Sequence, residues 1–249
     1  MAPGAHNGPV TEPSTTSRRD EIASRLETVR GRIAGACDRS GRSADEVTLT
    51  VVTKFFPASD VRLLAELGVR HVGENRHQEA QAKAAECADL DLVWHFIGGL
   101  QSNKAAAVAS YAAVVESVDR SKLLRGLATG AHHRGRELDV LVQVDLDPEA
   151  SAGSGRAGAD PADVLDLARQ VVDIEGLRLR GVMTVAPLGV DPAPAFARLG
   201  ELAARVRQVE PAATWVSAGM SADLEAAVES GATHVRIGSA VLGGRPAGR

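Results

Sequence analysis

The chain has 249 residues, 44% of them hydrophobic, so it can bury a full core without dividing into two domains. Its net charge of -4 argues against a nucleic-acid surface, which would normally be basic. No apolar run reaches the roughly 18 residues needed to span a bilayer, and the N-terminal stretch lacks the apolar core of a signal peptide. We expect a cytoplasmic protein with neither a nucleic-acid partner nor a membrane partner.

The residue types give little support for metal or disulfide chemistry. The two cysteines, Cys37 and Cys87, lie far apart without metal-type spacing, in helix-like sequence where small buried hydrophobes are expected. His132 and His133 lie in a polar stretch with no third ligand nearby. We therefore expect no metal site.

The N-terminal segment differs from the rest of the chain. Residues 1–16 are rich in Pro, Gly and Thr with almost no large apolar side chains, which predicts a disordered tail. A helical pattern then runs from residue 18 to residue 40. Its apolar residues share one face: Ile22, Leu26, Val29, Ile33 and Ala36. We expect one domain over residues 17–249, with this helix ahead of its first strand.

Apolar strands and amphipathic helices then alternate to the end of the chain. The predicted strands cover residues 47–54, 71–75, 92–97, 113–118, 138–146, 179–185, 214–218 and 234–237. The predicted helices between them cover residues 59–67, 76–87, 102–110, 120–131, 162–172, 194–209 and 222–231, and a short closing segment ends the chain. Ser59 is a candidate cap for the first of these helices and Gly68 a candidate stop.

Eight such units favour a parallel sheet closed into a single (β/α)8 TIM barrel. A doubly wound sheet would want a Gly-x-Gly-x-x-Gly turn after its first strand, and Lys54-Phe-Phe-Pro57 does not resemble one. The predicted fold is therefore an α/β barrel with an extra N-terminal helix.

The first predicted strand ends on a lysine. Alternation places Val47, Leu49 and Val51 on one face of this strand and carries Lys54 on the other. Partial burial would lower the pKa of the Lys54 amine and leave it nucleophilic. On the local pattern alone, the commoner alternative is a lysine that snorkels to solvent at a strand end.

Two stretches after the last strands are rich in small residues: Ser217-Ala-Gly-Met-Ser-Ala-Asp223 and Arg236-Ile-Gly-Ser239. Small residues let backbone amides approach an anion, and the loops after strands seven and eight commonly bind phosphate in this fold. Alternatively, Ser221 caps a helix and Gly219 and Gly238 only allow tight turns. Together with Lys54, the pattern suggests a phosphorylated carbonyl compound held as a Schiff base, with pyridoxal 5'-phosphate (PLP) the leading candidate.

Other polar residues fall at predicted strand ends with open roles. His95 is either a satisfied core histidine or a site residue. Glu74 can pair structurally, and Asn75 can stabilise a turn. We assign no catalytic residue.

The chain resembles the pyridoxal phosphate homeostasis protein family, which has an alanine-racemase N-terminal-like barrel. The resemblance covers about residues 18–244. The matching signatures are Val52-Thr-Lys54-x-x-Pro57, Gly73-Glu-Asn75, Trp94-His-Phe-Ile-Gly98 with Leu100-Gln-Ser-Asn-Lys104, Ser217-x-Gly-Met-Ser-x-Asp223 and Val235-Arg-Ile-Gly-Ser239.

This resemblance implies that Lys54 forms an internal aldimine with PLP. It implies that the phosphate lies against Ser217, Gly219, Ser221, Arg236, Gly238 and Ser239, and that Asn75, His95 and Met183 line the ring pocket. It also implies a role in intracellular vitamin B6 balance and cofactor supply, with PLP-dependent apoenzymes as partners and no established reaction.

The sequence departs from the family pattern in two places. The family often has a second lysine two positions after the Schiff-base lysine, where this chain has Phe56. The family's Asn…Glu-x-x-Lys-x-Gly after strand five is replaced by Asp145…Glu149 and a glycine-rich loop over residues 151–158 that contains Arg156. An auxiliary cofactor site involving that second lysine is therefore not expected.

Two functions remain to be weighed. A non-catalytic PLP carrier fits a single barrel with no recognisable acid–base partner. A PLP-dependent amino-acid racemase would need a base on the opposite face of the cofactor, and Tyr111, the single tyrosine, falls before the fourth strand. A phosphate-binding barrel without PLP would leave Lys54 unexplained. We favour the carrier and expect a monomer.

Overall fold

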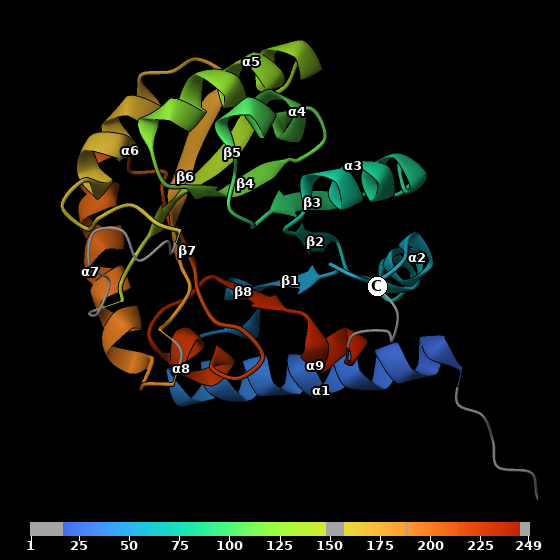
Figure 1. The fold of residues 1–249 in the computed structure, drawn as a ribbon. Coiled ribbons are helices and arrows are strands. Elements are labelled where there is room, and N and C mark those ends of the chain that lie inside the picture. Colours follow the sequence, from blue (N-terminus) through green and yellow to red (C-terminus); the bar gives the residue numbers. More distant parts are fainter. Residues whose placement is uncertain (1–16, 148–156, 188, 245–249) are drawn as a thin grey trace, which may run out of the picture.

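The computed structural model describes residues 17–147, 157–187 and 189–244 and contains a closed eight-stranded barrel (Figure 1). The strands are β1 Thr48–Val52, β2 His71–Glu74, β3 Val93–Phe96, β4 Val114–Val118, β5 Leu138–Val144, β6 Leu177–Thr184, β7 Trp215–Ser217 and β8 His234–Ile237. Each strand pairs in parallel with the next, and β8 pairs with β1 to close the barrel. The predicted (β/α)8 fold is confirmed.

Helices surround the barrel strands. The α-helices are α1 Arg18–Arg39, α2 Ala58–Glu66, α3 His77–Glu86, α4 Ala105–Ala109, α5 Leu124–Arg134, α6 Val164–Val172, α7 Ala193–Val209, α8 Leu224–Glu229 and α9 Ser239–Leu242. Short 3-10 turns precede β1, α4 and α5: η1 Ala44–Glu46, η2 Ser102–Lys104 and η3 Ser121–Leu123. No helix in the described parts of the chain has the length and apolar character to cross a membrane.

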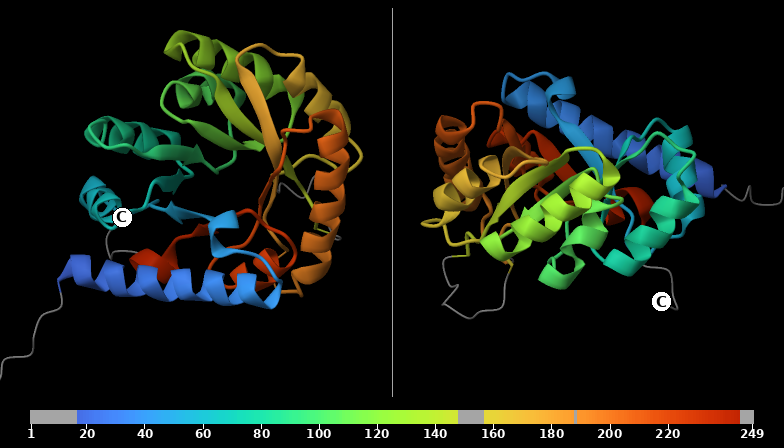
Figure 2. Two further views of the ribbon diagram at one scale, coloured as in Figure 1. Left: turned by 180° about the vertical axis from the view of Figure 1, so that it is seen from behind. Right: turned by 90° about the horizontal axis from the view of Figure 1, so that it is seen from above.

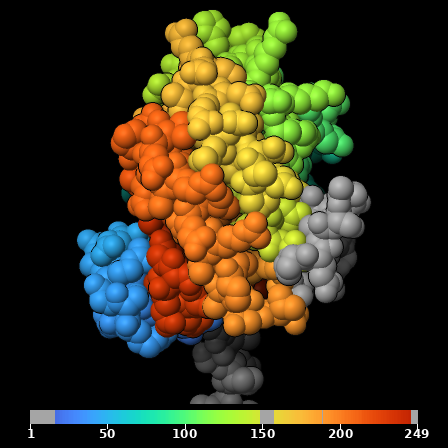
Figure 3. Space-filling model, turned by 90° about the vertical axis from the view of Figure 1, so that its left-hand side faces the viewer, coloured from blue at the N-terminus to red at the C-terminus, as the bar shows by residue number. Residues whose placement is uncertain are grey.

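The extra N-terminal helix, α1, is also confirmed. Ser17 caps it by accepting a hydrogen bond from the Asp20 amide at 3.2 Å. Its apolar stripe is buried, and the helix runs alongside α8 and α9 (Figures 1 and 2). On the surface, α8 fills the space between α1 and α7 (Figure 3). The predicted tail, residues 1–16, lies outside the described residues.

Two local predictions in the first unit were wrong. The first strand ends at Val52, two residues before Lys54, because the chain turns at Phe55, where φ is 72°. Helix α2 begins one residue before Ser59 and has Pro57 at its N-cap, so Ser59 is not the cap. Gly68 ends this helix as predicted, with φ 81°.

The core separates into apolar and polar layers. The predicted alternation on β1 is confirmed, since Val47, Leu49 and Val51 pack into the apolar cluster around α1. Inside the barrel, a small apolar cluster includes Met183. Buried polar side chains occupy other interior positions: Thr50, His95, Glu116, Ser217 and Arg236. A polar barrel interior therefore underlies the carboxyl ends of the strands.

Candidate functional site

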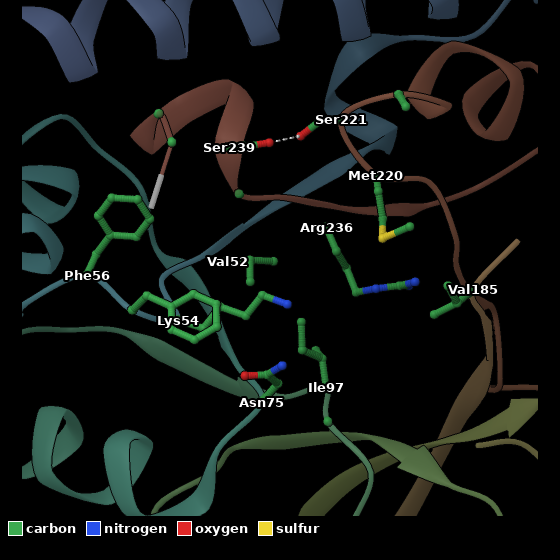
Figure 4. A pocket seen from close by; sticks show the side chains of 16 residues that line it. Val52, Lys54, Phe56, Asn75, Ile97, Val185, Met220, Ser221, Arg236 and Ser239 are labelled. Atoms are coloured by element: carbon green, nitrogen blue, oxygen red, sulfur yellow. Dashed lines mark hydrogen bonds between the residues drawn. The ribbon is translucent and has the colours of Figure 1, made fainter. Parts of the chain in front are cut away.

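A cavity of about 560 Å³ opens at the carboxyl ends of the barrel strands (Figure 4). Its lining comes from β1 and β8 near their carboxyl ends and from the segments that follow β1, β2, β3, β6, β7 and β8. Six of the residues predicted from the sequence line it: Lys54, Asn75, Ser221, Arg236, Gly238 and Ser239. This is the face of the fold where function is expected.

Lys54 lies on the turn just after β1, and its side chain extends into the cavity (Figure 4). The side chain is half-buried rather than free in solvent. Neighbouring Phe55 and Phe56 are buried and also line the cavity. The Arg18 guanidinium lies 5.7 Å from the centroid of the Phe56 ring.

A buried ion-pair cluster surrounds the peptide that carries Lys54. Lys83 Nζ donates to the Thr53 carbonyl, Glu74 Oε1 and Glu79 Oε1, each at 2.7 Å. The Thr53 hydroxyl donates to Glu74 at 2.6 Å, and the Phe55 amide donates to Glu79 at 2.6 Å. Burial raises the pKa of Glu74, although Lys83 opposes the shift.

Asn75 forms the wall beside Lys54. Its side-chain oxygen is buried and has no hydrogen-bond partner within the described residues, so it can accept a hydrogen bond from a ligand. Gly98 packs directly behind this residue, because a Cβ at position 98 would lie 2.3 Å from the Asn75 carbonyl oxygen. The close approach of the two loops therefore needs a glycine at position 98.

The opposite wall carries two hydroxyl groups from adjacent loops. Ser239 Oγ lies 3.4 Å from Ser221 Oγ, which also accepts from the Ala240 amide at 3.4 Å. Helix α8 has Asp223, not Ser221, at its N-cap, so the helix-capping alternative for Ser221 was wrong. A Cβ at Gly238 would lie 3.3 Å from the Val52 carbonyl oxygen. This end offers hydroxyl donors beside a closely packed glycine.

Arg236 lies across the cavity from Lys54 (Figure 4) and is almost completely buried. Its Nη1 donates to Ser217 Oγ at 2.6 Å and its Nη2 to the Thr184 carbonyl at 2.7 Å. Burial lowers the pKa of Arg236, while the charge of Glu116 opposes the shift. The guanidinium is thus a fixed cation in the cavity lining.

A hydrogen-bonded chain continues from Arg236 through the barrel interior. Ser217 donates to Glu116 at 2.6 Å, Glu116 lies 2.7 Å from His95 Nδ1, and His95 Nε2 lies 2.9 Å from His71 Nδ1. Burial alone would raise the pKa of Glu116, but the hydrogen bond and charge of His95 and the charge of Arg236 outweigh it and lower the pKa to about 2. Glu116 is therefore a buried carboxylate with partners on both sides.

Four predicted residues are not among those that line the cavity: His95, Met183, Ser217 and Gly219. His95 and Ser217 belong to the buried chain, and Met183 packs with Val114 and Leu141 inside the barrel. Gly219 has φ 92°, and a Cβ there would lie 2.7 Å from the Ala227 Cβ. Of the four, Ser217 and Gly219 hydrogen-bond Arg236 directly, and His95 is linked to it through Glu116 and Ser217.

Lys83, Glu79 and Glu116 belong to the buried contacts around the site but were not predicted from the sequence. The i, i+4 spacing of Glu79 and Lys83 on a helix is a recognisable signal, but it ordinarily marks a solvated pair. Glu116 stood out as the single charge in the apolar run of β4. In the loop after strand five, Glu149 and Arg156 lie outside the described residues.

Comparisons with known proteins show the family to which the chain belongs. The family model for the alanine racemase N-terminal domain matches residues 42–246. The chain is 44% identical over 244 residues to the pyridoxal phosphate homeostasis protein of Mycobacterium tuberculosis, covering 92% of this chain and 94% of the relative. It is 41% identical over 230 residues to that of Pseudomonas aeruginosa, covering 91% and 97%.

Among the solved structures, some share both sequence and fold with this chain, and others share only the fold. PipY of Synechococcus elongatus, solved with PLP bound, superposes with a TM-score of 0.77 at 37% identity, covering 89% of this chain and all of PipY. Alanine racemase from Streptomyces coelicolor shares the fold, with a TM-score of 0.65 at 18% identity, covering 87% of this chain and 58% of the racemase. The chain belongs to the pyridoxal phosphate homeostasis protein family, within the wider group that shares the alanine racemase N-terminal barrel.

Proposed function

We propose that this protein binds PLP in the cavity through Lys54 and serves intracellular PLP homeostasis as a carrier. The observation that carries the proposal is a lysine amine and a pair of serine hydroxyls on opposite walls of one cavity. The names of the relatives and the PLP-bound PipY structure support the same ligand.

The residues present fit this cofactor. PLP supplies an aldehyde that condenses with a lysine amine, with release of water, and a phosphate dianion at the other end of a pyridine ring. The cavity volume lies within the range of small-molecule sites, roughly 300–1,000 Å³. The buried Asn75 side-chain oxygen has no hydrogen-bond partner within the described residues, so it favours a ligand with a polar group over an apolar one.

Each predicted residue has a distinct part in the proposed site. Lys54 supplies the amine, and Asn75 accepts a hydrogen bond beside it. Ser221, Gly238 and Ser239 receive the phosphate, while the Arg236 guanidinium supplies a positive charge in the cavity lining. The remaining residues act from behind these groups: Ser217 and His95 hold Arg236 through the buried chain, Met183 packs the interior and Gly219 shapes the loop.

A carrier accounts for the site better than a racemase. Racemization by two bases needs a proton donor on each face of the substrate carbon. Tyr111, the single tyrosine in the sequence, stacks on His77 with ring centroids 5.9 Å apart and is not among the residues that line the cavity. We further propose that the protein acts in the cytoplasm as a monomer and that PLP-dependent apoenzymes receive its cofactor.

An absorbance titration tests this proposal. Purified protein mixed with PLP should develop a band near ~420 nm, the usual region for the cofactor joined to a protein lysine. A Lys54→Ala variant should give only the spectrum of free PLP. Incubation of the loaded protein with L-alanine or D-alanine should produce no interconversion of the two. Identical spectra for both proteins would overturn the proposal, and interconversion would favour the racemase.

A further inference from the structure

We propose that Lys83, together with Glu74 and Glu79, is a positioning cluster that fixes the peptides on both sides of Lys54 and so holds its amine in the cavity. The inference rests on the proposed function of Lys54. It assigns a role to a buried lysine that lies outside the lining of the cavity.

Lys83 is saturated by partners from three segments of the chain. Its ammonium group donates to a carbonyl after β1, to a carboxylate on β2 and to a carboxylate one turn earlier on α3. An ammonium group has three N–H donors, so this cluster uses all of them. Lys83 is 5% exposed and Glu74 is 1% exposed, so water cannot replace these contacts without local opening.

The contacts converge on the two residues that flank Lys54. Thr53 is held at its carbonyl by Lys83, at its hydroxyl by Glu74 and at its amide by the Gly73 carbonyl at 2.9 Å. On the other side, the Phe55 amide is held by Glu79. The Lys54 backbone is therefore fixed at both of its peptide bonds by one connected group of charges.

The local backbone gives a physical reason for such a cluster. Phe55 has φ 72°, a region that large non-glycine residues rarely adopt. Such conformations persist where surrounding contacts over-determine them. The Arg76 guanidinium, 4.8 Å from the centroid of the Phe55 ring, holds the side chain while Glu79 holds the amide. The turn that directs Lys54 into the cavity thus depends on groups from α3 and its N-terminal boundary.

An apolar residue at position 83 would fill space without performing this task. It would leave Glu74 without its cation and the Thr53 carbonyl with only the Phe56 amide, at 3.1 Å, as a donor. A displaced turn would move the Lys54 amine away from the reacting position, and a displacement of about 1 Å can slow a positioned reaction about 100-fold.

The test compares cofactor-free Lys83→Met protein with the unaltered protein. On mixing with PLP, the rate of appearance of the ~420 nm band should fall at least about tenfold. Before PLP is added, hydrogen exchange at the Phe55 amide should be at least about tenfold faster, since its anchor Glu79 has lost Lys83. Lys122→Met, which removes the same charge from an exposed position, should stay within about twofold of the unaltered protein in both measurements.

A double variant separates positioning from general stability. Glu74→Gln with Lys83→Met removes the uncompensated carboxylate and should recover part of the stability lost in Lys83→Met, yet its reaction with PLP should stay about tenfold slow. Recovery of the unaltered rate in the double variant, or a rate within about twofold for Lys83→Met itself, would overturn the positioning role. If the unaltered protein forms no band, the proposed function fails instead.

Discussion

At the lysine end of the cavity, charged side chains hold the backbone of a turn, whereas at the arginine end they hold a side chain that comes from a strand. Lys54 follows β1 on a turn with a positive φ, and the Lys83 cluster fixes the peptides beside it. Arg236 comes from β8, whose backbone is already fixed by its neighbours, so only its guanidinium needs partners.

This difference predicts how each end responds to substitution of a partner residue. Loss of a partner at the arginine end should leave a buried charge unpaired while the backbone stays in place. Loss of a partner at the lysine end should move the backbone itself. Changes at the arginine end should therefore mainly lower the free energy of unfolding, whereas changes at the lysine end should also slow the reaction with PLP.

The largest expected effect on stability is at Glu116. Its side chain is 1% exposed and its carboxylate serves both Ser217 and His95, so Glu116→Leu leaves Arg236 without its nearest carboxylate. We expect a loss of about 3–5 kcal/mol in the free energy of unfolding, measured with urea. Glu116→Gln, which keeps the size and one acceptor, should lose less. Equal losses would show that the charge is not what matters.

A somewhat smaller loss of stability is expected at the lysine end. Lys83→Met should lower the free energy of unfolding by about 3 kcal/mol, near the lower limit for a broken buried pair, because water can reach the partly exposed side chain of Glu79. Among folded molecules, the rate of reaction with PLP should fall more in Lys83→Met than in Glu116→Leu. The reverse order of the two reaction rates would contradict the comparison.

The barrel strand that carries Arg236 should also contribute a pH dependence, through His234 at its first position. Burial, with smaller effects of His95, His71 and Arg180, lowers the pKa of His234 from 6.5 to about 3, although the Glu116 charge opposes the shift. Since the fold favours the neutral imidazole, its stabilisation is present above pH 6.5 and is lost as the pH falls toward 3. The unfolding free energy should therefore decline with a slope of up to about 1.4 kcal/mol per pH unit from this residue. Urea titrations of His234→Gln over this window should show a shallower decline; an unchanged slope would exclude His234 as its source.

The smallest effect is expected at the hydroxyl pair. Ser239→Ala removes one of two hydroxyls at the proposed phosphate end, and the hydrogen bond between them is long, at 3.4 Å. We expect PLP affinity to fall about tenfold, near the lower limit of about 1.5 kcal/mol for one hydrogen bond to a charged group. Affinity for pyridoxal, which lacks the phosphate, should not change in a parallel titration. A parallel loss for both ligands would place the phosphate elsewhere.

The fold could be predicted from the sequence because its signal repeats eight times. Apolar strands buried on both faces and amphipathic helices alternate in the order that a parallel barrel requires. The errors fall at boundaries such as the end of β1, where the positive φ of Phe55 breaks the strand. Nothing in the residue type of Phe55 predicts that conformation, which is stabilised by contacts from α3.

The site could be predicted only in outline. The sequence indicates which strand end a residue follows, but not how deeply its side chain lies in the barrel. For this reason the sequence could not show that Ser217 and His95 lie behind the lining, although their strands lead to the cavity. Lys83 resembles a surface residue in sequence, since its burial depends on the packing of α3 against the turn after β1.

The most direct test of the account is to map the covalent site. Loaded protein would be treated with borohydride, which fixes PLP to the lysine that holds it, then digested and analysed by mass spectrometry. The sequence has four lysines, Lys54, Lys83, Lys104 and Lys122, so the result is unambiguous. The account predicts one modified peptide, the one that contains Lys54. Modification chiefly at Lys83, Lys104 or Lys122, or at none of the four, would contradict it.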